Sequence, residues 1–218
     1  MQKRTLPLVL LFALLISLSA QAQVRFGVKA GLTSSRVISS SKGAASYNPR
    51  VAWQAGALAD LGISRHFSIQ PAVLLSSKGY NTKNDFSSIG STLNLDATYS
   101  PLYIEVPILA LLKINLGNTV RLFGGLGPYA AVGIGGQKNI KTSGVEATTD
   151  IKYGNDGGDF KQTDFGGSLA IGAEIGGLLL GANYNFGLAD LAPGGGNTTL
   201  RNASLGLTIG YLFGSSKR

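Results

Sequence analysis

The chain has no cysteine and a single histidine, and only 14% of its residues are charged. Without cysteine it cannot form a disulfide or carry a lipid on an N-terminal cysteine. Its one histidine, His66, begins an apolar segment beside a short turn, away from the long connections where an outward-facing lipid enzyme or a Ser-His hydrolase would need it. Nucleophilic catalysis that depends on histidine is therefore disfavoured. We expect a protein that is not an enzyme and that uses no cofactor.

The sequence also lacks an apolar run long enough to cross a membrane as a helix. Lys3 and Arg4 precede an apolar stretch over residues 6–18, which falls short of the roughly 20 residues that a spanning helix needs. Small residues follow in an A-x-A arrangement that ends at Ala22. This layout predicts a secretory signal peptide over residues 1–22 and a mature domain over residues 23–218; the alternative is an N-terminal membrane anchor.

Compact clusters of Lys and Arg are missing too, although the formal net charge is +8. The cations are scattered over the candidate loops, so we expect no nucleic-acid partner. They could meet anionic lipid head groups; the alternative is ordinary solvated loop charge. A Gly/Asp stretch over residues 155–159 offers carboxylates for Ca²⁺, but its spacing does not match an EF-hand loop. We expect a flexible turn there and no metal site.

What the chain does have is alternation. In residues 24–33 every even position is apolar, and the odd positions hold Gly, Thr or a cation. A period of two predicts a β-strand with one apolar face. Segments of this kind are predicted at 24–33, 50–61, 66–78, 101–114, 120–133, 164–175, 178–188 and 202–213.

The connections between these strands alternate in length. Those around 62–65, 115–119 and 176–177 are short, whereas 34–49, 79–100, 134–163 and 189–201 are long. Short turns at one end and long loops at the other are typical of outer-membrane barrels, with the short turns periplasmic. The fold class predicted is therefore all-β, an eight-stranded antiparallel up-and-down transmembrane barrel. Both termini are expected on the periplasmic side and the long loops outside the cell.

The two faces of the strands indicate which side meets the membrane. The non-apolar face is mostly Gly, Ser, Thr and Asn, too small and uncharged for a soluble exterior, so we expect the apolar face to meet lipid. The alternative is a lipocalin-like barrel with that face inward. Pro107 predicts a bulge or kink near residues 105–107. Two aromatic girdles are expected on the apolar face, formed by Phe26, Phe67, Tyr211 and Phe213 at one end and by Trp53, Phe165, Tyr184 and Phe186 at the other.

Several charged residues fall on the positions that alternate with the apolar ones, so we expect them to point into the lumen. Charges in a narrow lumen must be paired. We expect Glu105 and Glu174 to pair with Arg121 or Lys29, as a plug of ion pairs that closes the barrel. The alternative is a gate that rearranges to pass ions. The candidate site is therefore a lumen network, drawn from Arg25, Lys29, Glu105, Arg121 and Glu174; Asp60 and Lys113 have the same phase.

Several motifs resemble the PorT-type outer-membrane β-barrel family of the Bacteroidota, which are Gram-negative bacteria. Residues 26–32 are similar to its opening strand, 103–107 to its mid-barrel motif, and 123–129 and 164–167 to its fifth and sixth strands. The resemblance covers nearly all of the mature chain and implies an eight-stranded barrel, like the small OmpA and OmpX barrels, in the outer membrane. Some members of the family are tied to protein secretion and gliding. The chain departs from many outer-membrane proteins in ending not on an aromatic but on five residues after Phe213.

Together these features predict a monomeric barrel that acts by contact through its long loops. The expected partners are outer-membrane lipids and lipopolysaccharide, or other surface or secretion proteins. The alternative function is a narrow porin-like channel for ions or small solutes.

Overall fold

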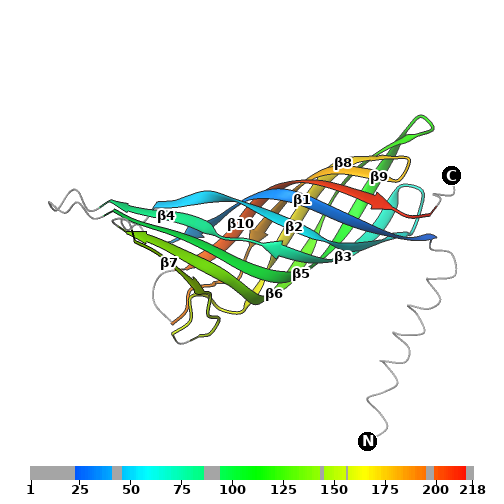
Figure 1. The fold of residues 1–218 in the computed structure, drawn as a ribbon. Helices are drawn as coiled ribbons and strands as arrows, with labels where there is room; N and C mark the ends of the chain where they lie inside the picture. Colours follow the sequence, from blue (N-terminus) through cyan, green and yellow to red (C-terminus); the bar gives the residue numbers. More distant parts are fainter. Residues whose placement is uncertain are drawn as a thin grey trace, which may run out of the picture.

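A computed structural model describes residues 23–40, 46–85, 94–142, 145–155, 157–194 and 199–214. The predicted signal peptide lies outside the described residues. Among the described residues, no helix is long and apolar enough to cross a membrane. The strands, shown in Figure 1, are β1 (Gln23–Ser39), β2 (Ser46–Gly62), β3 (Phe67–Ser77), β4 (Tyr80–Asp85), β5 (Asn94–Leu116), β6 (Val120–Thr142), β7 (Val145–Asp150), β8 (Thr163–Ile175), β9 (Leu178–Gly187) and β10 (Leu200–Leu212).

The strands form a closed antiparallel ring. β1 pairs with β2 on one side and with β10 on the other, which joins the first and last strands of the chain. β4 continues the wall after β3, and β7 is paired to the end of β6, so the ring itself has eight strands. Closure satisfies the backbone hydrogen bonds of every wall strand without exposing an edge to lipid. The predicted eight-stranded fold is confirmed.

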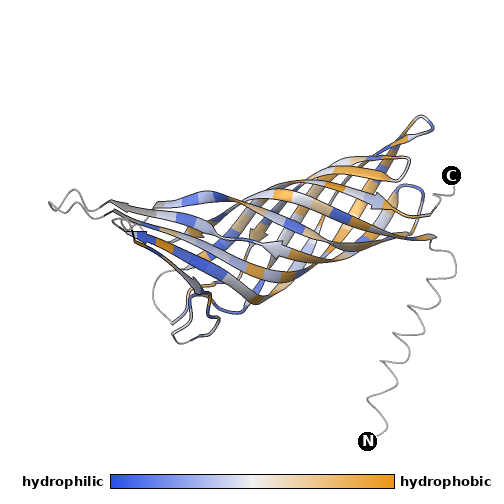
Figure 2. Ribbon diagram, in the orientation of Figure 1, coloured by the Kyte–Doolittle hydropathy of each residue, from blue (hydrophilic) through white to orange (hydrophobic). Residues whose placement is uncertain are grey.

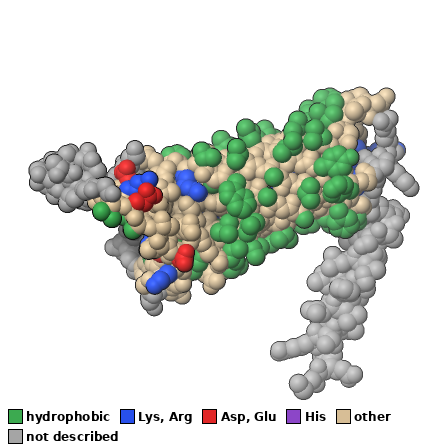
Figure 3. Space-filling view, viewed as in Figure 1, with side chains coloured by type: hydrophobic (Ala, Val, Ile, Leu, Met, Phe, Trp, Pro, Cys, Tyr) green, Lys and Arg blue, Asp and Glu red, His purple; other side chains and the backbone are tan. Residues whose placement is uncertain are grey.

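An apolar belt covers the outside of the ring. Phe26 and Leu207 are 67% and 72% exposed, and the residues paired with them on the same face, Ala59 and Leu32, are also apolar. In Figure 2 the hydrophobic residues are concentrated in the part of the wall nearer the short turns, and in Figure 3 apolar side chains cover the same part while charged side chains gather at the opposite end. Of the eight aromatic residues predicted to form the two girdles, seven are exposed on this face and Phe67 is half-buried there. The apolar face therefore points outward, as expected for a wall that meets lipid.

A charge placed in this belt should destabilise the barrel strongly. Leu207 lies midway along the apolar stretch of β10. An arginine at the bilayer midplane lowers the stability of such barrels by about 2–4 kcal/mol, and we expect this loss for Leu207→Arg. Urea unfolding in phospholipid vesicles measures the loss. Val145→Arg is the matched control, because Val145 is equally exposed but lies on β7, beyond the belt. Equal losses for the two variants would contradict the assignment of the belt.

The long connections were predicted as loops, but much of their length is strand. β1 runs to Ser39, β2 starts at Ser46, β5 starts at Asn94 and β6 runs to Thr142. The wall therefore continues beyond the apolar belt, with β4 and β7 in the extension (Figure 1). The prediction was wrong because it depended on apolar alternation. Beyond the belt the outer face is polar, so the backbone pairing persists while the alternation is lost.

The structure has no bulge at residues 105–107, where a bulge or kink was predicted. Pro107 stays in register opposite Tyr129, and the register shift in this pair of strands lies between Leu102 and Tyr103. There β6 supplies one extra residue, Ile134, and Gly136 two positions further on has a φ of 135°, which suits glycine. Because proline has no backbone N–H, Pro107 removes one hydrogen-bond donor from the sheet, but it adds no extra residue to the strand.

Candidate functional site

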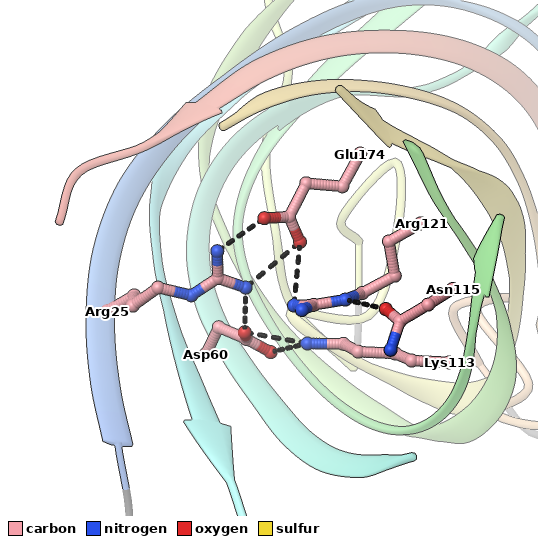
Figure 4. A network of polar contacts seen from close by, with 6 residues as sticks. All are labelled: Arg25, Asp60, Lys113, Asn115, Arg121 and Glu174. Carbon is pink, nitrogen blue, oxygen red and sulfur yellow. Dashed lines mark hydrogen bonds and ion pairs between the residues drawn. The ribbon is translucent and has the colours of Figure 1, made fainter. Parts of the chain in front are cut away.

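The lumen beside the short turns contains a cluster of charged side chains, which we call the mouth network: Arg25, Asp60, Lys113, Asn115, Arg121 and Glu174 (Figure 4). The Arg25 guanidinium donates to Asp60 Oδ2 at 2.7 Å and to both carboxylate oxygens of Glu174. Lys113 Nζ lies 2.6 and 2.7 Å from the two oxygens of Asp60. These pairs connect β1, β2, β5 and β8 across the barrel.

Arg121, from β6, completes the mouth network. Its Nη1 lies 3.6 Å from Glu174 Oε2, and its Nε donates to Asn115 Oδ1 at 2.8 Å. A cavity of about 560 Å³ lies beside these side chains and is also lined by the three short turns. Arg25, Asp60, Lys113 and Glu174 are buried, whereas Arg121 is only half-buried.

A second cluster, the inner network, lies deeper and is centred on Lys78. This lysine is 2% exposed, and its Nζ lies 2.6 Å from Glu105 Oε2 and 3.0 Å from Asp164 Oδ2. The same Nζ lies 4.5 Å from the centre of the Tyr129 ring, a cation–π contact. Lys78 follows directly after β3, and Glu105 and Asp164 come from β5 and β8. The network therefore connects distant walls of the ring.

Neutral side chains complete the inner network. Asn185 donates to Glu105 Oε1 at 3.0 Å, and Asn202 donates to Asp164 Oδ2 at 2.9 Å. The Tyr129 hydroxyl lies 3.3 Å from both oxygens of Asp164. Each buried carboxylate thus has a charged partner and a neutral one, which offsets the cost of removing it from water.

The end of the lumen opposite the short turns is filled by an aromatic cap. Tyr80 and Tyr99 stack with ring centres 5.0 Å apart, and Phe160 meets both edge-on at 6.2 and 5.9 Å. Tyr80 and Tyr99 come from the extended wall, whereas Phe160 comes from the connection between β7 and β8. Val37, Ile151 and Leu191 pack into the same cluster. The cap therefore closes the wall extension from within.

The connection between β9 and β10 is held against the cap by Asp190. Its carboxylate accepts hydrogen bonds from the backbone N–H groups of Leu200 at 3.0 Å and Ala192 at 3.1 Å, and Lys161 Nζ lies 3.0 Å away. The bond from Leu200, with the other two contacts, lowers the pKa of Asp190 in spite of partial burial. Because the folded pKa is lowered, this contribution to stability is present at neutral pH and is lost in acid.

The five predicted site residues divide between these clusters. Arg25, Arg121 and Glu174 meet in the mouth network, whereas Glu105 belongs to the inner network and pairs with neither Arg121 nor Lys29 in the ion pairs described. Lys29 is half-buried and lines a small cavity of about 40 Å³ together with Glu105.

Sequence analysis missed Lys78 and Asp164 as members of the lumen network. Both have the inward phase of the segments 66–78 and 164–175, but they lie at the ends of those segments, where the alternation stops. The phase alone could have identified them. The prediction instead named Arg121 and Lys29 as partners of Glu105.

Two other predicted features lie outside the lumen networks. His66 is exposed in the turn between β2 and β3, where its carbonyl accepts the Lys113 N–H at 2.8 Å. In the Gly/Asp stretch, Asp159 is bound by Lys138 Nζ at 2.6 Å, whereas Asp156 lies outside the described residues. Among the residues that the structure describes, no three His, Cys, Asp or Glu side chains are grouped to hold a metal ion.

A closed eight-stranded ring with an apolar exterior and a polar, ion-paired interior defines a transmembrane β-barrel of the outer-membrane type. Residues 19–192 match the family described as outer membrane protein beta-barrel domain, and the chain belongs to this family. It is therefore an outer-membrane β-barrel protein.

The chain is similar to solved structures, the first of which shows the same fold. The outer membrane protein OprG from Pseudomonas aeruginosa is 12% identical, with a TM-score of 0.51 over 89% of this chain and 98% of that chain. Ail, the attachment invasion locus protein of Yersinia pestis, is 14% identical, with a TM-score of 0.42 over 88% of this chain and 99% of that one. No curated protein matches the chain in sequence.

Proposed function

We propose that this protein is a monomeric, non-enzymatic barrel that acts by contact at the cell surface, through the wall extension beyond its apolar belt. The observation that carries the proposal is that side chains fill the lumen, whereas the wall extends well beyond the apolar belt. The expected contacts are lipopolysaccharide, other surface proteins or a protein-export complex. The resemblance of its motifs to the PorT-type family of the Bacteroidota supports the last of these.

The filled lumen argues against the alternative, a narrow channel. Tyr103 and Glu105 are both 0% exposed and Lys78 is 2% exposed, so water has little access to the middle of the barrel. A passage would require the inner network to separate, and breaking a buried ion pair costs about 3–5 kcal/mol. The aromatic cap adds a second obstruction beyond it.

Planar-bilayer recording tests this choice. Under the proposal the purified protein gives no steady single-channel current, and Glu105→Gln gives none either. Steady currents in the unchanged protein whose size or selectivity is altered by Glu105→Gln would overturn the proposal and establish the channel. Migration that differs between unboiled and boiled samples on a gel serves as the control for folding.

The asymmetry of the two ends supports an orientation with the wall extension outside the cell. The three short turns and the ends of β1 and β10 lie together at one end, the arrangement found on the periplasmic side of such barrels. The chain contains no cysteine, so a single introduced thiol can be followed on whole cells. Ala147→Cys on exposed β7 should react with a membrane-impermeant maleimide, and Ile63→Cys in a short turn should not. The opposite result would reverse the orientation.

The same two variants test contact directly. A photo-crosslinker attached to the introduced thiol of Ala147→Cys should give discrete adducts with surface protein or lipopolysaccharide on intact cells. The thiol of Ile63→Cys, labelled after the cells are opened, provides the comparison at the other end. An absence of adducts from β7 would contradict a contact role for the wall extension.

A further inference from the structure

The cavity at the mouth of the barrel has the size and lining of a ligand site. Its volume of about 560 Å³ lies within the range of small-molecule pockets. The mouth network forms its inner wall and the three short turns form its rim, with Arg65 on the turn between β2 and β3. The cavity lies at the end of the molecule opposite the wall extension.

The charges that line this cavity do not balance. Among the described residues that line it, four cationic side chains, Arg25, Arg65, Lys113 and Arg121, face only two carboxylates, Asp60 and Glu174. All four carboxylate oxygens are already engaged by Arg25, Lys113 or Arg121. Two positive charges are therefore left in excess after the ion pairs have formed.

This excess of positive charge is larger at the mouth than deeper in the lumen. In the inner part of the barrel, Lys29 and Lys78 face Glu105 and Asp164, and Arg50, which donates to the Lys78 carbonyl at 3.3 Å, adds one positive charge. Between the two groups lies an apolar layer that contains Leu58 and Leu212, which are paired with Gly27 between Arg25 and Lys29. A concave site with low-dielectric walls and one dominant sign of charge concentrates counter-ions of the opposite sign.

We propose that the mouth cavity is a binding site for a small oxyanion, a phosphate or carboxylate group on a soluble molecule. Arg121 projects toward the centre of the lumen (Figure 4), and Arg65 lies exposed at the rim. Guanidinium groups bind both anions through paired N–H donors. The apolar layer stops the anion at the mouth, so the site binds without transporting.

Calorimetry on the full-length protein, purified in a nonionic detergent, tests this site with inorganic phosphate and citrate as probes. Binding of either probe is expected, and which of them binds distinguishes phosphate from carboxylate recognition. The double variant Arg65→Gln/Arg121→Gln removes the excess charge and should weaken binding by about tenfold or more. The gel-migration assay checks that the variant still folds.

The matched control is Arg36→Gln/Arg201→Gln, which makes the same change in net charge at exposed positions of β1 and β10 near the other end. It should change the affinity by less than about twofold. An equal loss in both double variants would reduce the effect to general charge attraction and overturn the proposal. So would an absence of binding heat for both probes up to about 10 mM.

Discussion

Lys78→Met should lower the free energy of unfolding by about 3–5 kcal/mol, the usual cost of removing one partner from a buried ion pair. Lys78 is 2% exposed and neutralises Glu105 and Asp164 together. Methionine fills most of the volume of the lysine stem but leaves two carboxylates in a lumen with little water. Urea unfolding of the purified protein in phospholipid vesicles measures the loss.

A second variant distinguishes the effect of the unpaired carboxylates from the effect of altered packing at Lys78. Lys78→Met combined with Glu105→Gln and Asp164→Asn removes all three charges while keeping similar shapes, so much of the lost stability should return. Asn185 and Asn202 can still bond to the two amides. A loss below about 1 kcal/mol for Lys78→Met alone would mean that water reaches the inner network.

Phe160→Ala should loosen the aromatic cap, with a local loss of about 3–5 kcal/mol. Phe160 is 2% exposed and contacts Tyr80 and Tyr99. It lies on a connection outside the hydrogen-bonded ring, so the connection should open without unfolding the wall. Hydrogen exchange of residues 151–162 should therefore accelerate by about 100-fold or more.

Phe213→Ala provides the matched control for the cap. Phe213 undergoes the same truncation but is 54% exposed on the outer face, beside Tyr211. It should leave exchange in residues 151–162 unchanged. If Phe160→Ala instead lowers the stability of the wall strands as much as that of the connection, then the cap and the barrel unfold as one unit.

The outer face and the strand count were predictable because both depend on local alternation. Within the belt each strand faces lipid on one side and a crowded lumen on the other, so residues two apart meet the same surroundings. Beyond the belt this difference disappears. The outer ends of β5 and β6 keep their pairing but lose the alternation, which explains why they were predicted to be loops.

The amino-acid sequence thus determined by itself the all-β class, the apolar exterior and most of the charges that turn inward. It also placed Arg25, Arg121 and Glu174 in the lumen by their phase. Only the tertiary structure decided which charges meet, because barrel closure brings together residues as distant as Arg25 and Glu174, 149 positions apart. Phase fixes the side of the wall on which a residue lies, whereas the stagger and tilt of the closed ring fix its height and neighbours. That is why Glu105 pairs with Lys78 rather than with Lys29 or Arg121.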